Sequence, residues 1–195
     1  MGTDALNPAA CAAFLVAAFS LAGFCQAAWL GSARSRRFAV PIDARLTIRG
    51  RRLLGDNKTV RGFLVMVPAT ALGFAALSAV IRLTGLGGGL WPYPAAGYLA
   101  LGFWAGLGFM AGELPNSFIK RQLDIAPGAS PNGRVTSLVC HGIDRFDSVV
   151  GMLVVVSLAV PVPWLTWLYA LIAGPVLHGA FSLLVFRLGG KARAA

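Results

Sequence analysis

The sequence predicts an all-α integral membrane protein with about five transmembrane helices, its N-terminus outside the cell and its C-terminus in the cytoplasm. Hydrophobic residues make up 57% of the 195 positions, whereas Asp, Glu, Lys and Arg make up only 12%. A soluble domain carries about 25% charged residues. The charges also stand in blocks between long uncharged runs, which excludes an ordinary soluble globule. The high apolar content excludes a disordered chain.

Five stretches of the chain are long enough, or nearly long enough, to cross a bilayer, which takes roughly 20 apolar residues. No Lys or Arg precedes the first stretch, unlike a signal peptide, so we expect it to be retained. The prolines of VPVPW at 160–164 divide the last long uncharged run into two spans. The expected spans of this single domain, residues 1–195, are 10–30, 62–81, 95–112, 141–160 and 164–186.

Basic residues predict the orientation of these spans. The segment 31–61 holds nine of the 17 Lys and Arg residues, and most of the others lie in 113–147 and after residue 186. Because Lys and Arg accumulate on the cytoplasmic side, five spans with an outside N-terminus place all of them except Arg82 in the cytoplasm. We therefore expect cytoplasmic loops at 31–61 and 113–140, and an active site on the cytoplasmic face of the inner or plasma membrane.

The net charge of +10 is explained by this topology and by the anionic headgroups of the lipid bilayer. Nucleic acid is not an expected partner, because the basic residues have no soluble fold to carry them. A basic face would attract a polyphosphate substrate. The third span indicates close helix packing, within the chain or in a homo-oligomer, through glycines at 102, 106, 108 and 112.

Three of the seven acids lie at the ends of expected spans, where an ionisable group is costly and is a functional candidate. Glu113 closes the third span, and Asp144 and Asp147 share one helical face at the start of the fourth. Two carboxylates held close together need a cation or a proton between them. Mg²⁺ prefers oxygen ligands, and Glu113 is the expected third ligand beside Asp144 and Asp147. The alternative is a structural network that pairs Asp144 and Asp147 with Arg145 and Lys120.

Two further segments bring cations to the same side. In GELPNSFIKRQL at 112–123, Ser117, Lys120 and Arg121 fall on one helical face, at three- and four-residue spacing.

The second segment, GDNKTVRGF at 55–63, precedes the second span. Gly55 permits a tight turn and Thr59 can cap the following helix. The helix N-terminus, together with Lys58 and Arg61, suits a phosphate. Carboxylates for a metal and cations for phosphates predict phosphoryl or nucleotidyl chemistry at the inner interface.

A resemblance to a known superfamily rests on SFIKR at 117–121 followed by HGIDRFDS at 141–148. These stretches resemble the signature of CTP-dependent phosphatidate cytidylyltransferases. GDNKTVRG, SFIKRQLDIAPG and DRFDSVVG resemble more closely the CDP-archaeol synthase branch, in the same order over most of 51–151. The chain reads QLDIAPG and HGI where the diacylglycerol branch usually has Lys-Asp and a double glycine, which favours the archaeol-like branch.

The resemblance implies that CTP and a lipid phosphate, archaeol-like or phosphatidate-like, give a CDP-lipid and pyrophosphate for phospholipid synthesis. Mg²⁺ is the implied cofactor, and a second, monovalent cation is left open. Glu113 stands where the family usually has Asp, and its longer side chain shifts the geometry. The implied catalytic residues are Asp144, Asp147, Lys120 and Arg121. The implied metal ligands are Asp144, Asp147 and Glu113. The implied substrate-binding residues are Asn57, Lys58, Thr59, Arg61, Ser117, His141 and Arg145.

Two other functions stay open at this point. A CTP-dependent polyprenol kinase would transfer the γ-phosphate of CTP to a lipid alcohol, giving a lipid phosphate and CDP. A non-catalytic small transporter or membrane scaffold would use its acids only to pair with the basic loops, and would have no metal dependence.

Overall fold

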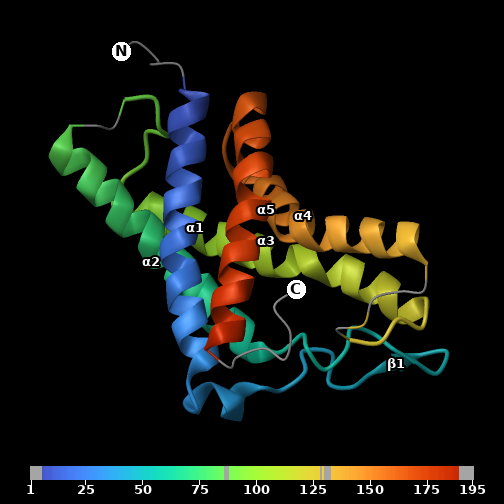
Figure 1. The fold of residues 1–195 in the computed structure, drawn as a ribbon. Coiled ribbons are helices and arrows are strands. Elements are labelled where there is room, and N and C mark those ends of the chain that lie inside the picture. Colours follow the sequence, from blue (N-terminus) through green and yellow to red (C-terminus); the bar gives the residue numbers. More distant parts are fainter. Residues whose placement is uncertain (1–5, 86–87, 128, 130–132, 189–195) are drawn as a thin grey trace.

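The computed structural model describes residues 6–85, 88–127, 129 and 133–188. Within these residues the chain forms five long helices, which confirms the predicted helical fold class: α1 (Pro8–Gly31), α2 (Val60–Thr84), α3 (Ala95–Gln122), α4 (Arg134–Ala159) and α5 (Trp164–Arg187). A short 3-10 helix, η1 (Arg34–Phe38), and a hairpin of β1 (Thr47–Ile48) and β2 (Arg51–Arg52) lie between α1 and α2 (Figure 1).

Helices that follow one another in the sequence are also neighbours in space. α1 packs on α2, α2 on α3, α3 on α4 and α4 on α5, and α5 returns to α1. In Figure 1, α1 and α5 run side by side, while α3 and α4 run together away from them. Aromatic side chains fill part of the interior, where the ring of Phe14 lies 5.0 Å from that of Phe74 and 5.2 Å from that of Tyr98.

Four helices of the described part of the chain, α1, α2, α3 and α5, are long and apolar enough to cross a membrane. α4 is outside this set because it carries three charged residues near its middle, Asp144, Arg145 and Asp147. Any stretch of α4 that is 18 residues long, about the length needed to cross a membrane, contains all three. The expected fourth span, 141–160, lies on α4 apart from its last residue. The apolar part of α4 that follows Asp147 is by itself too short to cross a bilayer.

The connections between helices gather at two ends of the molecule. At one end, the Asn7 N–H donates to the α2–α3 connection at 2.8 Å, and Trp91 Nε1 donates to the Pro161 carbonyl at 2.8 Å. At the other end, Arg51 Nη1 donates to the Gln122 carbonyl at 2.7 Å, joining the α1–α2 loop to the end of α3. α4 leaves this second end and finishes at the first. All five helices therefore pass between the two ends.

The limits of α3 and α4 differ from those of the expected spans and loops. α3 does not stop with the expected third span at residue 112 but continues through Pro115 to Gln122. Bilayer-spanning helices tolerate proline where neighbouring groups satisfy the freed carbonyl. The segment 113–140 is not a loop throughout, since α4 already begins at Arg134 and only residues 123–133 connect the two helices. The extended end of α3 packs against α4, where Asn116 and Lys120 bond to Asp144.

The glycines of α3 pack within this chain, which confirms the predicted close helix contacts. A Cβ at Gly102 would lie 2.8 Å from Phe74 of α2. A Cβ at Gly108 would lie 2.7 Å from the Gly151 carbonyl oxygen of α4, and one at Gly112 would lie 2.9 Å from Gly151 Cα. Because neighbouring helices of the same chain fill these contacts, the glycines give no separate support to a homo-oligomer.

Gly151→Val is expected to lower the free energy of unfolding by about 3 kcal/mol, because an added side chain forces α3 and α4 apart. A Cβ at Gly151 would lie 2.6 Å from Gly112 Cα. Gly142→Val is the matched control, since a Cβ at Gly142 of the same helix meets nothing within 4 Å. Thermal unfolding in detergent measures both variants. Equal melting temperatures would contradict the close α3–α4 contact.

The basic loop between α1 and α2 is organised by Asp43, whose side chain is only 1% exposed. Asp43 accepts hydrogen bonds from Arg52 Nη2 at 3.0 Å and from the Leu54 N–H at 3.1 Å. Burial alone would raise the pKa of Asp43. The hydrogen bonds from Arg52 and from the backbone N–H groups of Leu54, Arg45 and Gly55 outweigh burial and hold that pKa below its ordinary value of 3.8.

Asp43→Asn is expected to lower the free energy of unfolding by about 2 kcal/mol near neutral pH. Because the folded-state pKa of Asp43 lies below its unfolded value, this contribution is present above about pH 4 and is lost as the pH falls through the folded pKa. Asp56→Asn is the control, since Asp56 pairs with the same Arg52 but its side chain is 66% exposed. Thermal unfolding at several pH values separates the two. A constant difference between Asp43→Asn and wild type across pH would contradict the assignment.

Candidate active site

The acids predicted to be functional lie along the contact between α3 and α4. Glu113 of α3 forms an ion pair with Lys58, which comes from the loop before α2. The Ser148 hydroxyl of α4 donates to Glu113 Oε1 at 2.8 Å, and the Ser148 N–H donates to Asp147 Oδ1 at 2.7 Å. Ser148 therefore joins two carboxylates from different helices.

The same row of contacts continues toward the end of α3. Asn116 Nδ2 donates to Asp147 Oδ2 at 2.9 Å and to Asp144 Oδ1 at 2.6 Å. Lys120 Nζ lies 2.5 Å from Asp144 Oδ2. Three carboxylates thus alternate with two neutral donors, and a lysine closes the row at each end.

The three acids predicted as metal ligands do not form one metal-binding cluster. Across the described ranges, no group of three or more His, Cys, Asp or Glu side chains is placed to hold a metal ion. Both oxygens of Asp144 face Lys120 or Asn116. Glu113 and Asp147, on either side of Ser148, nevertheless fit a hard cation, because Mg²⁺ is usually held by one or two carboxylates together with phosphates and waters.

Arg121 is a buried cation without hydrogen-bond partners at two of its nitrogen atoms. The residue is only 8% exposed, and neither Nε nor Nη1 has a partner among the described residues. The turn at Gly55, whose φ of +117° favours glycine, lies against it, since a Cβ there would be 3.6 Å from Arg121 Nε. Burying a charge without partners is costly, so this arrangement favours an anion beside Arg121.

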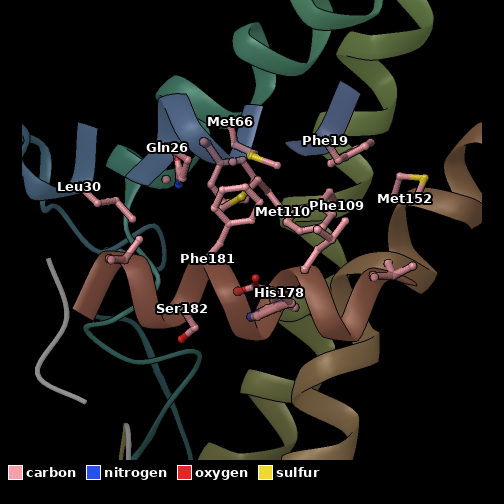
Figure 2. A pocket seen from close by; sticks show the side chains of 18 of the residues that line it. Phe19, Gln26, Leu30, Met66, Phe109, Met110, Met152, His178, Phe181 and Ser182 are labelled. Carbon is pink, nitrogen blue, oxygen red and sulfur yellow. The ribbon is translucent and has the colours of Figure 1, made fainter. Parts of the chain in front are cut away.

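A cavity of about 840 Å³ lies among the five helices, next to the row of acids. Figure 2 shows the apolar side chains that point into it, including Phe19, Met66, Phe109, Met110 and Phe181. These residues come from α1, α2, α3 and α5, and α4 adds Met152. The apolar walls suit hydrocarbon chains.

The cavity also has polar lining residues. The GDNKTVRGF segment contributes four of them, and Glu113 joins them from α3. Gln26 of α1 and His178 and Ser182 of α5 line the cavity as well (Figure 2). One cavity therefore combines the apolar walls and the cations that an amphiphilic phosphate requires, and a carboxylate borders it. The four lining residues of the GDNKTVRGF segment are Asn57, Lys58, Thr59 and Arg61.

Two of the predicted substrate-binding residues form no ion pair with the acids among the described residues. His141 is exposed on α4, and the Arg145 Nε donates to its Nε2 at 3.3 Å. The Arg145 guanidinium instead packs toward α5, where a Cβ at Gly179 would lie 2.7 Å from Nη1. Of the expected structural network, only the pair between Lys120 and Asp144 is formed among the described residues.

Two other predicted residues occupy less distinctive positions. Ser117 is buried on α3, at 7% exposure. Thr59 is the N-cap residue of α2, as expected, but its side chain makes no capping hydrogen bond.

Sequence reasoning missed Asn116, Ser148 and Gln26. Asn116 stands four residues before Lys120, and therefore on the same helical face, which is a signal that could have identified it. Ser148 directly follows Asp147, but nothing in the sequence indicates that its hydroxyl reaches Glu113. Gln26 is a lone amide in an apolar span, a position at which a polar group is a functional candidate.

Comparisons with known proteins match this chain to one family. A family model described as "CarS-like: CDP-archaeol synthase" matches residues 36–193. A CDP-archaeol synthase of Halobacterium salinarum is 32% identical over 160 residues, which cover 77% of this chain and 81% of the relative. One of Pyrococcus furiosus is 30% identical over 154 residues, with the same two coverages.

A solved structure shares the fold. It is described as "Structural insight into an intramembrane enzyme for archaeal membrane lipids biosynthesis", and it aligns with a TM-score of 0.52 at 24% sequence identity. The alignment covers 82% of this chain and 90% of that one. By the family match and by its relatives, the chain belongs to the CDP-archaeol synthase family.

Proposed function

We propose that this chain uses the α3–α4 row of acids, Arg121 and the cavity to join CTP to an archaeol-like lipid phosphate. Membership of the CDP-archaeol synthase family makes the chain a membrane cytidylyltransferase, an enzyme that makes a CDP-lipid from CTP and a lipid phosphate. The observation that carries the proposed site is the buried Arg121, whose Nε and Nη1 have no partner among the described residues, beside the turn at Gly55.

The lipid phosphate is assigned to the cavity. Its chains would lie against the apolar walls, and its phosphate would lie beside Lys58 and Arg61. The cavity also borders Glu113, so a phosphate there comes close to the row of acids. The triphosphate of CTP is assigned to Lys120 and Arg121, which follow one another at the end of α3.

In the reaction, an oxygen of the lipid phosphate attacks the α-phosphorus of CTP and forms a new P–O bond. The bond from the α-phosphorus to the bridging oxygen breaks, and pyrophosphate leaves with that oxygen and its electron pair. A phosphate monoester is largely ionised near neutral pH, so the attack needs no dedicated base. The chain's part is to position the two phosphates and to neutralise charge with Lys58, Lys120 and Arg121.

We further propose Mg²⁺ as the cofactor, held by Asp147 and Glu113 with phosphate oxygens, and with Asp144 as a predicted third ligand. When bound, such an ion neutralises phosphate charge in the transition state. The oxygen donors and the separation of Glu113 and Asp147 by a single serine support this assignment.

We place the site on the cytoplasmic side of the inner or plasma membrane. The loop that carries Lys58 and Arg61 belongs to the segment 31–61, which holds nine Lys and Arg residues. Such residues accumulate on the cytoplasmic side.

The test is a product assay with purified full-length protein in detergent, given CTP, Mg²⁺ and a panel of lipid phosphates: unsaturated dialkyl, diacyl and polyprenyl. We expect a CDP-lipid by mass and one pyrophosphate per CDP-lipid, with the dialkyl phosphate used best. Polyprenol with CTP is run in parallel, because a polyprenol kinase would release CDP and form a lipid phosphate. Folded protein that forms no CDP-lipid from any lipid phosphate would refute the proposal.

A further inference from the structure

Asn116 of α3 contacts both acids of the Asp144 and Asp147 pair. Its Nδ2 lies 2.6 Å from Asp144 Oδ1 and 2.9 Å from Asp147 Oδ2. An amide nitrogen of this kind carries two hydrogens, so each carboxylate can receive one. One neutral side chain therefore fixes the separation of two like charges that belong to another helix.

The two acids differ in the charge of their other partners. Asp144 pairs with Lys120, whereas no ion pair within the described residues includes Asp147. Asp147 is held instead by Asn116 and by Ser148, whose N–H lies 2.7 Å from Asp147 Oδ1. Neutral donors orient a carboxylate without cancelling its charge. Asp147 thus keeps its attraction for a cation.

Asn116 can contact both carboxylates because α3 and α4 lie close together. Asn116 lies about one helical turn after Gly112, where a Cβ would be 2.9 Å from Gly151 Cα of α4. At such a short distance between helices, the short Asn side chain is long enough to reach both carboxylates. The longer Lys120 side chain, one turn further along, bonds to Asp144 through both carboxylate oxygens.

We propose that Asn116 is a positioning residue that presents Asp147 to a divalent cation, an inference that rests on the proposed function. Asn116 acts through the two carboxylates and not on the reacting atoms. Without its amide, Asp144 and Asp147 are free to move apart, and the cation loses a ligand held in place. Binding of the lipid phosphate, which uses the cavity, is unaffected.

The experiment compares wild type with Asn116→Ala in the full chain in detergent. We expect the Mg²⁺ concentration for half-maximal rate to rise about 10- to 100-fold, the usual cost of losing a residue that orients a metal ligand. The Kd for Mn²⁺, measured by electron paramagnetic resonance with CTP and no lipid, should rise by a similar factor. The KM for the lipid phosphate should stay within about twofold. Asn116→Ser, which keeps one hydrogen-bond donor, should raise the Mg²⁺ requirement and the Kd for Mn²⁺ less than Asn116→Ala does. The serine variant replaces the alanine variant in the comparison if the alanine variant does not fold.

Ile119→Ala is the control, because Ile119 is 55% exposed on the same helix. Its Mg²⁺ and Mn²⁺ dependence should match wild type. Unchanged metal dependence in folded Asn116→Ala would overturn the proposal. An equal rise in the lipid KM would also overturn it, because it would mark Asn116 as a general packing contact. Wild-type protein that binds Mn²⁺ but forms no CDP-lipid would overturn the proposed function instead, and the Mn²⁺ comparison would still decide the role of Asn116.

Discussion

Asp147→Asn is expected to lower kcat/KM for CDP-lipid formation by roughly 1,000-fold, the upper range for losing one charge-stabilising group. The substitution preserves size but removes the negative charge that no described ion pair neutralises. An amide nitrogen at Oδ2 would also face the Asn116 Nδ2, which now lies 2.9 Å away, and two donors cannot bond. At Oδ1, the amide oxygen can still accept from the Ser148 N–H. The fold is therefore retained while the cation loses its ligand.

The measurement is CDP-lipid formation over a range of Mg²⁺ concentrations, with melting temperature recorded alongside. Asp124→Asn is the matched control, because Asp124 pairs with Arg51 and its side chain is 66% exposed. Its activity should stay within about twofold of wild type, since exposed ion pairs contribute little. Wild-type rates from Asp147→Asn at saturating Mg²⁺ would remove Asp147 from the proposed site.

Much of the fold could be predicted because long uncharged runs in a sparsely charged chain are typical of helices that cross a membrane. α1 and α5 begin and end within two residues of the expected spans, 10–30 and 164–186. The continuation of α3 through Pro115 could not be predicted, because it depends on what surrounds the freed carbonyl. The early start of α4 was missed because the segment before residue 141 is rich in Pro, Gly and Ser, which are typical of a loop.

The charged residues of the candidate site could be predicted from the sequence, but which side chain contacts which could not. Glu113, Asp144 and Asp147 stand out because acids at the ends of membrane spans are rare. The separation between α3 and α4 cannot be read from the residues, however, and that separation decides which lysine meets which acid. The alternative network paired the aspartates with Lys120 and Arg145, and a Lys120–Asp144 pair is observed, but nothing linked Lys58 to Glu113. The roles of Asn116 and Ser148 likewise depend on contacts between helices.

Arg121→Met is expected to lower kcat/KM for CTP by roughly 100- to 1,000-fold while raising the melting temperature of the ligand-free protein. The buried Nε and Nη1 atoms lack partners among the described residues. An unpaired buried cation destabilises the fold, and an apolar side chain of similar length removes that cost, by about 1 to 3 kcal/mol. A residue kept for folding alone would show the opposite, with stability and activity falling together.

Arg52→Met provides the comparison, because it makes the same change at an arginine that is paired. Arg52 Nη2 lies 3.0 Å from Asp43 Oδ1, and Nη1 lies 3.0 Å from Asp56 Oδ1. Its loss leaves the buried Asp43 without its cation, so the melting temperature should fall. CTP binding measured without lipid, together with thermal unfolding, shows whether each arginine binds the substrate or stabilises the fold. If Arg121→Met lowers stability as Arg52→Met does and binds CTP normally, Arg121 is a structural residue and the anion site lies elsewhere. If it is more stable and no longer binds CTP, the wild-type fold retains an unfavourable buried charge because the substrate requires it.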